Sequence, residues 1–249
     1  MIWEACNGLK QMCPISGTLY RLVESQEQVA TTGYVDTLEE QAVLEELLDN
    51  SKPDHPTDTP NELHYLLKTP FRYPPLLWGS RFGRVHEPSL FYGGASIEAT
   101  LSESAYYRFV FFLSMDGEPP KARLNTEHTV FSIGYQSERG IQLQEPPFDT
   151  YKDQLTDSKN YSATQQLGTA MRAASIEAFQ YVSARSIEPE LCAALYTPSA
   201  FTSTNPCSME NWLCELSAEQ VTFKAIQSSQ IYRFPRAQFE INGVFPLPA

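Results

Sequence analysis

The most restrictive feature of the sequence is a strand, glycine-pair and helix pattern between residues 78 and 112. The segment SLFY at 89–92 is typical of a β-strand, and Gly93-Gly94 follows it directly as a turn signal. Ser96 predicts a helix N-cap, because its hydroxyl can accept a hydrogen bond from a free N–H of the first turn. We therefore expect a strand that turns directly into a helix.

The predicted helix carries a carboxylate on a face that is otherwise apolar or aromatic. Glu103 shares this face with Ala99, Tyr106, Tyr107 and Val110. A carboxylate in such surroundings needs a partner or a ligand, because burial of an unpaired charge is costly. With Arg81 and Tyr92 of the same segment, it favours a site for an anionic, sugar-containing ligand over a plain hydrophobic core.

A second stretch, YSATQQLGTAMRAASIEAFQYVSARS at 161–186, has the same mixture of apolar and polar functional residues. Its first part, 161–174, has the periodicity of a helix, and 178–183 is typical of a strand. The stretch contains Arg172, Ser183 and Arg185. For both Arg172 and Arg185 a structural role is the stronger interpretation, and Arg185 is the better candidate of the two for a ligand site.

The remaining elements mix strands and helices without a regular alternation. Short strands are predicted at 18–23, 129–134, 141–144, 192–197 and 220–227. The absence of a strand–helix–strand rhythm favours the α+β class over a parallel α/β fold. At 249 residues, the chain is long enough to bury a full core in one domain, or in one domain with an elaboration.

The chain is acidic, and its excess charge is concentrated near the N-terminus. The net charge is −12, and residues 24–54 contain nine acidic residues against one basic residue, Lys52. An acidic surface repels phosphate backbones, so we expect no direct binding of nucleic acid. The rest of the chain is closer to neutral and leaves room for a basic pocket.

Within this acidic segment, residues 37–49 predict an amphipathic helix. Thr37 and Glu40 have the spacing of a capping box, and Leu44, Leu47 and Leu48 form an apolar stripe opposite an acidic face. We expect the helix to lie on the outer surface, away from any anion-binding cleft, with its leucines turned inward. A solvated surface helix and a partner-docking face both remain open interpretations.

Several other classes of protein are disfavoured. The N-terminus lacks the charged start and apolar run of a signal peptide, and no stretch approaches the roughly 18 consecutive apolar residues of a membrane helix. Five cysteines without a C-x-x-C pair support neither a disulfide framework nor a zinc site. The four histidines have no metal-ligand spacing. We expect a reduced, cytoplasmic protein without a metal.

The motifs of common nucleotide-binding and hydrolase folds are also absent. The sequence has no G-x-G-x-x-G after a strand, no G-x-x-x-x-G-K-[ST] and no G-x-S-x-G. Glu98 and Glu103 are five residues apart and point in different directions from a helix, so they do not form a glycosidase pair. The candidate site must therefore be explained by its arginines, tyrosine, carboxylate and serine.

These residues occur in an order that resembles the RES-domain family. The matching elements are Tyr20-Arg21, the step Arg81-Phe82-Gly83, the strand end Tyr92-Gly93, the helix with Glu103, and residues 161–185, the densest part of the match. The resemblance covers roughly residues 18–200. The acidic segment 24–75 is longer than in compact members, and SIEPEL follows Arg185 where many relatives carry glycines.

The resemblance implies a fold akin to ADP-ribosyltransferases, with two small twisted β-sheets and flanking helices around a cleft for NAD+. It implies an NAD+-consuming toxin of a bacterial toxin–antitoxin pair, with an Xre-type antitoxin protein as partner. It also implies the roles of the site residues: Glu103, Ser183 and Arg21 as catalytic, and Arg21, Arg81, Tyr92, Ser183 and Arg185 as contacts to NAD+. Carboxylate stabilisation of an oxocarbenium-like ribose and arginine contacts to pyrophosphate suit this chemistry.

Three functions remain open at this point. The leading one is an NAD+ glycohydrolase or phosphorylase, which transfers the ADP-ribosyl group to water or phosphate. The second is an ADP-ribosyltransferase that modifies a cellular protein, and the third is a non-catalytic interaction protein that works through its acidic surface. For the organisation of the chain we expect an N-terminal segment at 1–17, a catalytic domain at 18–200 with the acidic elaboration at about 24–75, and a C-terminal part at 201–249 packed on the same domain.

Overall fold

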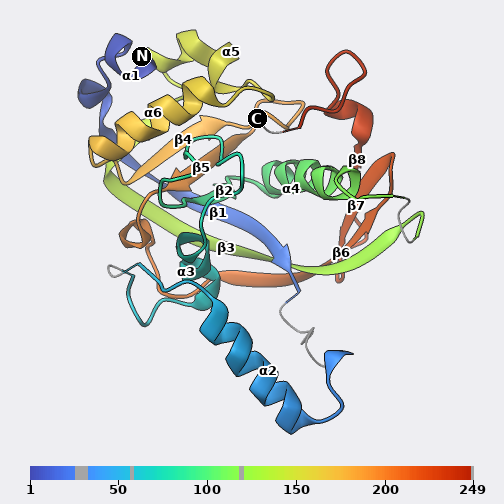
Figure 1. The fold of residues 1–249 in the computed structure, drawn as a ribbon. Coiled ribbons are helices and arrows are strands. Elements are labelled where there is room, and N and C mark those ends of the chain that lie inside the picture. The colour runs from blue at the N-terminus through green and yellow to red at the C-terminus, as the bar shows by residue number, and fades with distance from the viewer. Residues whose placement is uncertain (26–32, 57–58, 118–120, 248–249) are drawn as a thin grey trace.

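The computed structural model describes residues 1–25, 33–56, 59–117 and 121–247 (Figure 1). The helices are α1 (Ile2–Ala5), α2 (Leu38–Ser51), α3 (Tyr65–Arg72), α4 (Ile97–Leu113), α5 (Lys152–Leu155) and α6 (Ser162–Ala173). The strands are β1 (Cys13–Glu24), β2 (Phe91–Gly94), β3 (Leu124–Gln142), β4 (Ala178–Val182), β5 (Leu191–Leu195), β6 (Ser208–Leu216), β7 (Gln220–Ala225) and β8 (Tyr232–Pro235). The predicted α+β class is confirmed.

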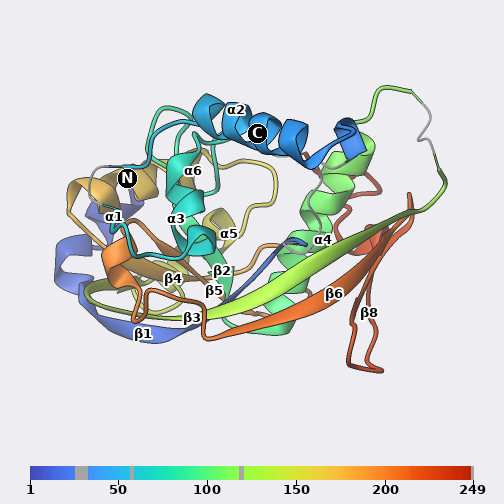
Figure 2. The ribbon, with the colours of Figure 1, turned by 90° about the horizontal axis from the view of Figure 1, so that it is seen from below.

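The eight strands form one sheet in the order β1-β2-β5-β4-β3-β6-β7-β8, and β1 also pairs with β3. This extra pairing closes the first five strands into a ring. The 19-residue strand β3 continues beyond the ring and pairs there with β6, so the two run side by side (Figure 2). The resemblance implied two small sheets, whereas the structure has one eight-stranded sheet, in which β3 joins the ring to the β6–β8 extension.

Three apolar clusters hold the helices against this sheet. Helix α6 packs on one face of β4 and β5 through Leu167 and Met171, and α3 covers the ring through Leu67 and Phe71. Helix α4 packs against the β6–β8 extension, where Phe109 is fully buried. The strand end of β2 and the start of α4 are therefore both anchored, which fixes the segment that the sequence singled out.

The pair Gly93-Gly94 is the last part of β2 and not a turn, which corrects the first expectation. Both residues pair with β5, and β1 approaches them closely. A Cβ on Gly93 would lie 3.0 Å from the carbonyl oxygen of Tyr20, and one on Gly94 would lie 2.6 Å from the backbone N of Thr100. Here glycine permits close packing of backbone, a reason that a local turn pattern does not reveal.

Helix α2 forms as predicted, and its cap is confirmed, since the Thr37 hydroxyl accepts a hydrogen bond from the Glu40 N–H at 3.1 Å. The expected inward orientation is wrong for Leu47 and Leu48, which are exposed, while Leu44 is half-buried. None of its residues is buried, and the Leu47 side chain is 62% exposed. In Figure 1 the helix projects from the body beyond α3, in keeping with the exposure of these side chains.

Other differences from the predictions concern length and boundaries. The strand expected at 129–134 and the first half of the one expected at 141–144 belong to the single strand β3, which ends at Gln142. Strands β6 and β8 and helix α3 were not predicted. Strand β1 begins at Cys13 and crosses the expected boundary at residue 17, while the division into domains stays a prediction. The part of the acidic elaboration at 26–32 and 57–58 lies outside the described residues. Within the described ranges no helix is long and apolar enough to span a bilayer.

Candidate functional site

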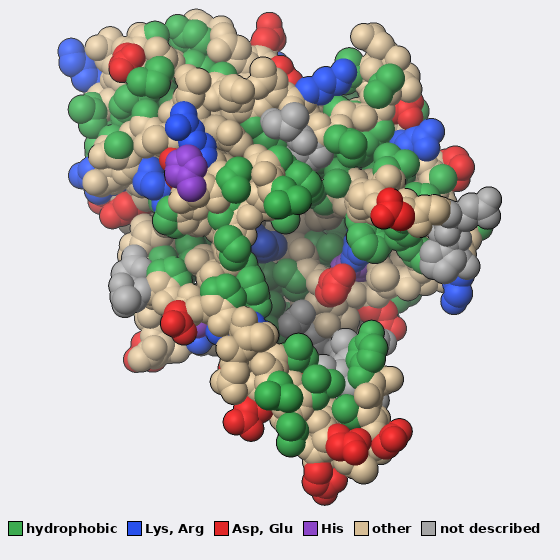
Figure 3. All heavy atoms as spheres, in the orientation of Figure 1, with side chains coloured by type: hydrophobic (Ala, Val, Ile, Leu, Met, Phe, Trp, Pro, Cys, Tyr) green, Lys and Arg blue, Asp and Glu red, His purple; other side chains and the backbone are tan. Residues whose placement is uncertain are grey.

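A cavity of about 1400 Å³ opens between the end of β1, strand β2, helix α3 and helix α4. Figure 3 shows a hollow in this face of the molecule with basic side chains inside it. Six basic residues line the cavity, against three acidic ones: Arg21, Lys52, Lys68, Arg72, Arg81 and Arg108 against Glu24, Asp49 and Glu103. The cavity therefore has the opposite sign of charge from the chain as a whole.

Arg21 extends from β1 into this cavity. Its Nη1 donates a hydrogen bond to the Tyr92 carbonyl oxygen at 2.9 Å, and its guanidinium lies 5.1 Å from the centroid of the Phe91 ring. Burial lowers the pKa of Arg21 to about 10, so it still carries its charge at neutral pH. Among the described residues no carboxylate forms an ion pair with it, and a desolvated cation of this kind favours an anionic ligand.

Tyr92 lines the same cavity, but its hydroxyl is already engaged. It lies 2.8 Å from Ser80 Oγ and accepts a hydrogen bond from the Phe82 N–H at 3.2 Å. Burial raises the pKa of Tyr92 to about 12, so the hydroxyl stays protonated at neutral pH. Tyr92 therefore fixes the loop around Ser80 and Phe82 through its hydroxyl and offers its ring to a ligand.

Glu103 projects from α4 into the cavity and is held by one strong contact. The Ser183 hydroxyl donates to Glu103 Oε1 at 2.5 Å, within the range of a charge-assisted hydrogen bond. Ser183 follows β4, is 4% exposed and does not itself line the cavity. The serine thus orients the carboxylate, and Glu103 is the group that can meet a ligand.

Arg81 lines the cavity near Glu103 but is largely engaged by the protein. Its Nη1 donates to the carbonyl oxygens of Leu155 at 3.3 Å and Asp157 at 3.0 Å. Burial disfavours its charge, but the nearby Glu103 carboxylate together with Tyr161, Tyr181 and Tyr107 outweighs this effect, and the pKa of Arg81 is raised above its ordinary value. Arg81 therefore supplies a positive field beside Glu103.

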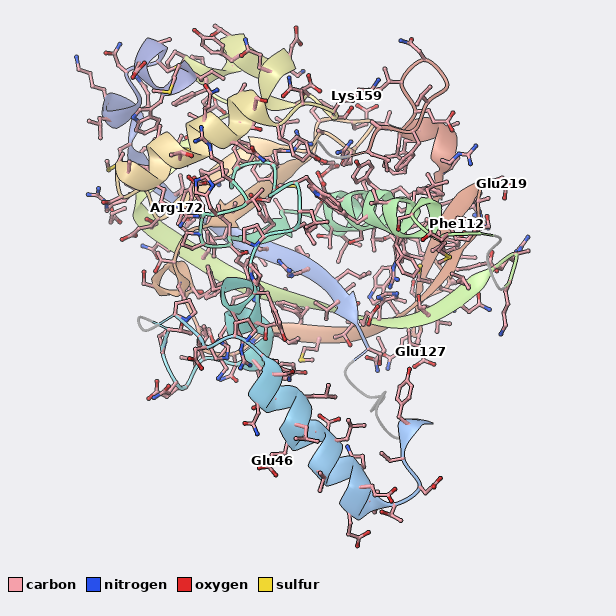
Figure 4. All side chains as sticks on the ribbon, viewed as in Figure 1. Glu46, Phe112, Glu127, Lys159, Arg172 and Glu219 are labelled. Atoms are coloured by element: carbon pink, nitrogen blue, oxygen red, sulfur yellow. The ribbon has the colours of Figure 1, made fainter. Side chains whose placement is uncertain are left out.

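The two arginines of residues 161–186, Arg172 and Arg185, do not line the cavity. Arg185 is 4% exposed, its Nη2 donates to Tyr161 Oη at 2.7 Å, and its guanidinium stacks 3.4 Å from the centroid of the Tyr106 ring. Arg172, labelled in Figure 4, donates to the Pro88 carbonyl and lies over the Tyr196 ring. These contacts agree with a structural role for Arg172. The contact between Arg185 and NAD+ stays a prediction, and the Arg185 side chain does not line the cavity.

The cavity also contains residues that the sequence did not single out. Tyr107 and Arg108 reach it from α4, and Lys68 and Arg72 reach it from α3. The C-terminal end of α2 contributes Asp49, so the expectation that this helix lies wholly away from the cleft is wrong. The i, i+4 spacing of Lys68 and Arg72 was a usable signal, because it places both cations on one helix face.

Comparison with known proteins identifies the family of the chain. A model of the RES domain family matches residues 56–217. The chain belongs to the RES-domain family. Its fold is similar to a chain of the M. tuberculosis MbcT–MbcA toxin–antitoxin complex, with 11% sequence identity, a TM-score of 0.49, and coverage of 87% of this chain and 92% of that one.

No curated protein matches the sequence. The family match reaches from the loop before α3 to the end of β6, and so contains Arg81, Tyr92, Glu103 and Ser183. Arg21 lies before it. Within the described ranges no group of three or more histidine, cysteine or acidic side chains could hold a metal ion, and the expected absence of a metal stays a prediction.

Proposed function

We propose that this RES-domain protein cleaves the nicotinamide–ribose bond of NAD+ and transfers the ADP-ribosyl group to water or phosphate. The observation that carries this proposal is the pair of opposite charges in one cavity. Arg21 is a half-buried cation without an ion-pair partner among the described residues, and Glu103 is a carboxylate held in place by Ser183. An anionic group that carries a ribose matches both.

In this reaction the bond between ribose C1′ and the nicotinamide nitrogen breaks, and nicotinamide leaves with the bonding electrons. Positive charge develops on the ribose, and the Glu103 carboxylate would stabilise it. Arg21 would hold the pyrophosphate, and the Tyr92 ring offers a stacking surface for the nicotinamide. Water or phosphate then attacks C1′ and completes the transfer.

We also propose that the protein acts as the toxin of a toxin–antitoxin pair. Membership of the RES-domain family supports an NAD+-using toxin, and an antitoxin of the Xre type is the expected partner. Such a partner would have to block the cavity, because the cavity holds both Arg21 and Glu103. Co-purification of the chain with a neutralising protein, and loss of NAD+ cleavage in that complex, would test this part of the proposal.

A non-catalytic interaction protein remains the second candidate because of one observation on α2. This helix exposes apolar side chains beside five acidic ones, and Figure 4 shows Glu46 on it, away from the body of the protein. If α2 is the working surface, the cavity has no turnover of its own.

The deciding experiment is incubation of the purified chain with NAD+, with detection of nicotinamide, ADP-ribose and labelled protein. We expect free nicotinamide and ADP-ribose, or ADP-ribose 1″-phosphate when phosphate is present. The variant Glu103→Gln keeps size and hydrogen bonding but removes the charge, and should lower turnover by roughly 10²–10³. Label on a target protein would instead support the ADP-ribosyltransferase alternative, and no turnover by a folded wild-type protein would refute the proposal.

A further inference from the structure

The six basic residues of the cavity differ in how they are neutralised. Asp49 lies 3.1 Å from Lys52 Nζ and 3.8 Å from Arg72 Nη1, and Glu24 lies 3.9 Å from Arg108. Arg81 forms no ion pair within the described residues, but the nearby Glu103 carboxylate favours its charged form. Across the part of the chain that the structure describes, Arg21 and Lys68 are the other two cations of the cavity without an ion-pair partner.

These two cations lie on different walls. Arg21 comes from β1 and bonds to the carbonyl of Tyr92, beside the strand that bears the candidate site. Lys68 comes from α3, one helical turn before Arg72, at the side of the cavity closed by the end of α2 and the loop after it. One anionic group at Arg21 therefore leaves the charge of Lys68 available to another.

His55 adds a second sign of a polar ligand on the α3 side. It lines the cavity, and its Nδ1 is buried without a hydrogen-bond partner in the described residues. Arg72 Nε donates to the carbonyl oxygen of Pro53, two residues before His55, so the guanidinium lies beside this segment. Burial lowers the pKa of His55, and the charges of Arg72 and Lys68 lower it further, while Asp49 and Asp54 oppose them. A buried ring nitrogen without a partner is costly unless a ligand or water satisfies it.

We propose that Lys68, Arg72 and His55 form a second anion subsite of this cavity, separate from Arg21, which binds a phosphate monoester. A monoester carries up to two negative charges on a compact group, which suits a lysine ammonium and a neighbouring guanidinium. Its source is either a 2′-phosphate on the adenosine ribose of the dinucleotide or free inorganic phosphate, which accepts the ADP-ribosyl group when ribose C1′, held near Glu103, faces the α3 side of the cavity. The subsite refines the proposed function, on which the choice between these sources rests.

The size of the cavity is consistent with more than one anionic position. Small-molecule pockets usually have volumes of about 300–1,000 Å³. The cavity of about 1400 Å³ exceeds this range and reaches from Glu103 on α4 to His55 beyond α2. A dinucleotide held at Arg21 therefore leaves room for a further phosphate on the α3 side.

The first test measures binding alone, by titration calorimetry with adenosine 2′,5′-bisphosphate and with 5′-AMP, which differ by one phosphate monoester. If the subsite takes the 2′-phosphate, the bisphosphate should bind at least about tenfold more tightly, and Lys68→Ala should remove most of that difference. Lys159→Ala is the matched control, because Lys159 is an exposed lysine outside the cavity lining (Figure 4). This readout needs no turnover, so it stays informative if NAD+ cleavage fails.

The second test measures NAD+ cleavage at increasing concentrations of inorganic phosphate. If the subsite takes free phosphate, Lys68→Ala should raise the phosphate concentration for half-maximal stimulation by about tenfold or more, while Lys159→Ala behaves as wild type. A response in either test supports the subsite and identifies its source. The proposal is overturned if Lys68→Ala changes neither the bisphosphate preference nor the phosphate requirement, including the case in which it weakens both nucleotides equally.

Discussion

Removal of the Ser183 hydroxyl should slow the chemistry more than it weakens binding. The hydroxyl donates to Glu103 Oε1 at 2.5 Å and accepts a hydrogen bond from the Arg185 N–H at 3.0 Å. A hydrogen bond to a charged group contributes about 1.5–3 kcal/mol, so Ser183→Ala should lower kcat by roughly 10–150-fold if the bond is needed in the transition state. The KM for NAD+ should change far less, because Ser183 does not line the cavity.

The assay is steady-state NAD+ cleavage, with thermal unfolding measured on the same samples. Ser102→Ala is the matched control, since Ser102 is also buried and its hydroxyl donates to the Arg185 carbonyl at 2.7 Å, without contact to Glu103. Ser183→Ala leaves the Arg185 N–H unsatisfied and should cost about 1–3 kcal/mol of stability. Ser102→Ala should cost less, because Gln238 Nε2 still donates to the Arg185 carbonyl at 3.3 Å. Equal kcat values for the two variants would refute the positioning role of Ser183.

Three further predictions concern other parts of the molecule. Arg21→Ala should weaken NAD+ binding by roughly 10–150-fold in calorimetry. Arg21→Lys should restore only part of the affinity, since lysine lacks the planar guanidinium that binds an anion through two hydrogen bonds. Unchanged affinity in Arg21→Ala would place the pyrophosphate elsewhere. Burial, reinforced by Arg108, lowers the pKa of His128 to about 4, so its contribution to stability is present above pH 6.5 and is lost as the pH falls toward 4. The loss should reach about 3 kcal/mol relative to His128→Gln in denaturant titrations, and parallel pH profiles would contradict it. Replacement of Leu47 and Leu48 by serine should change the unfolding free energy by no more than about 0.5 kcal/mol each, whereas a large loss would show that α2 packs on the body.

Local patterns in the sequence were sufficient to predict most elements but not their pairing. The helix with Glu103 and the strand before it follow from spacing and a capping serine, and both are present. The ring is closed by β1 and β3, whose pairing joins residues far apart in the sequence, such as Leu19 and Ile133. No short-range pattern encodes such a contact. The turn predicted at Gly93-Gly94 is wrong for the same reason, because the close approach of β1 and α4 to these glycines is also long-range.

The predicted burial of the apolar stripe on α2 was wrong for a different reason. Apolar residues at helical spacing predict which side chains share a face, and they do not say whether that face is covered. Leu47 and Leu48 share a face as predicted, but both are exposed. Coverage depends on what the rest of the chain or a partner places against the helix.

The arginines show most clearly what sequence alone leaves open. Arg21, Arg81 and Arg185 are equivalent as residue types, and only their neighbours separate them. Carbonyl oxygens engage Arg81, and a tyrosine hydroxyl and ring engage Arg185, so the two stabilise the walls around Glu103. Arg21 forms a single carbonyl contact and has no carboxylate in an ion pair with it among the described residues. An anionic substrate can stabilise a partly buried cation that the fold does not neutralise, and for this reason we propose Arg21, rather than Arg81 or Arg185, as the arginine that binds the anionic group.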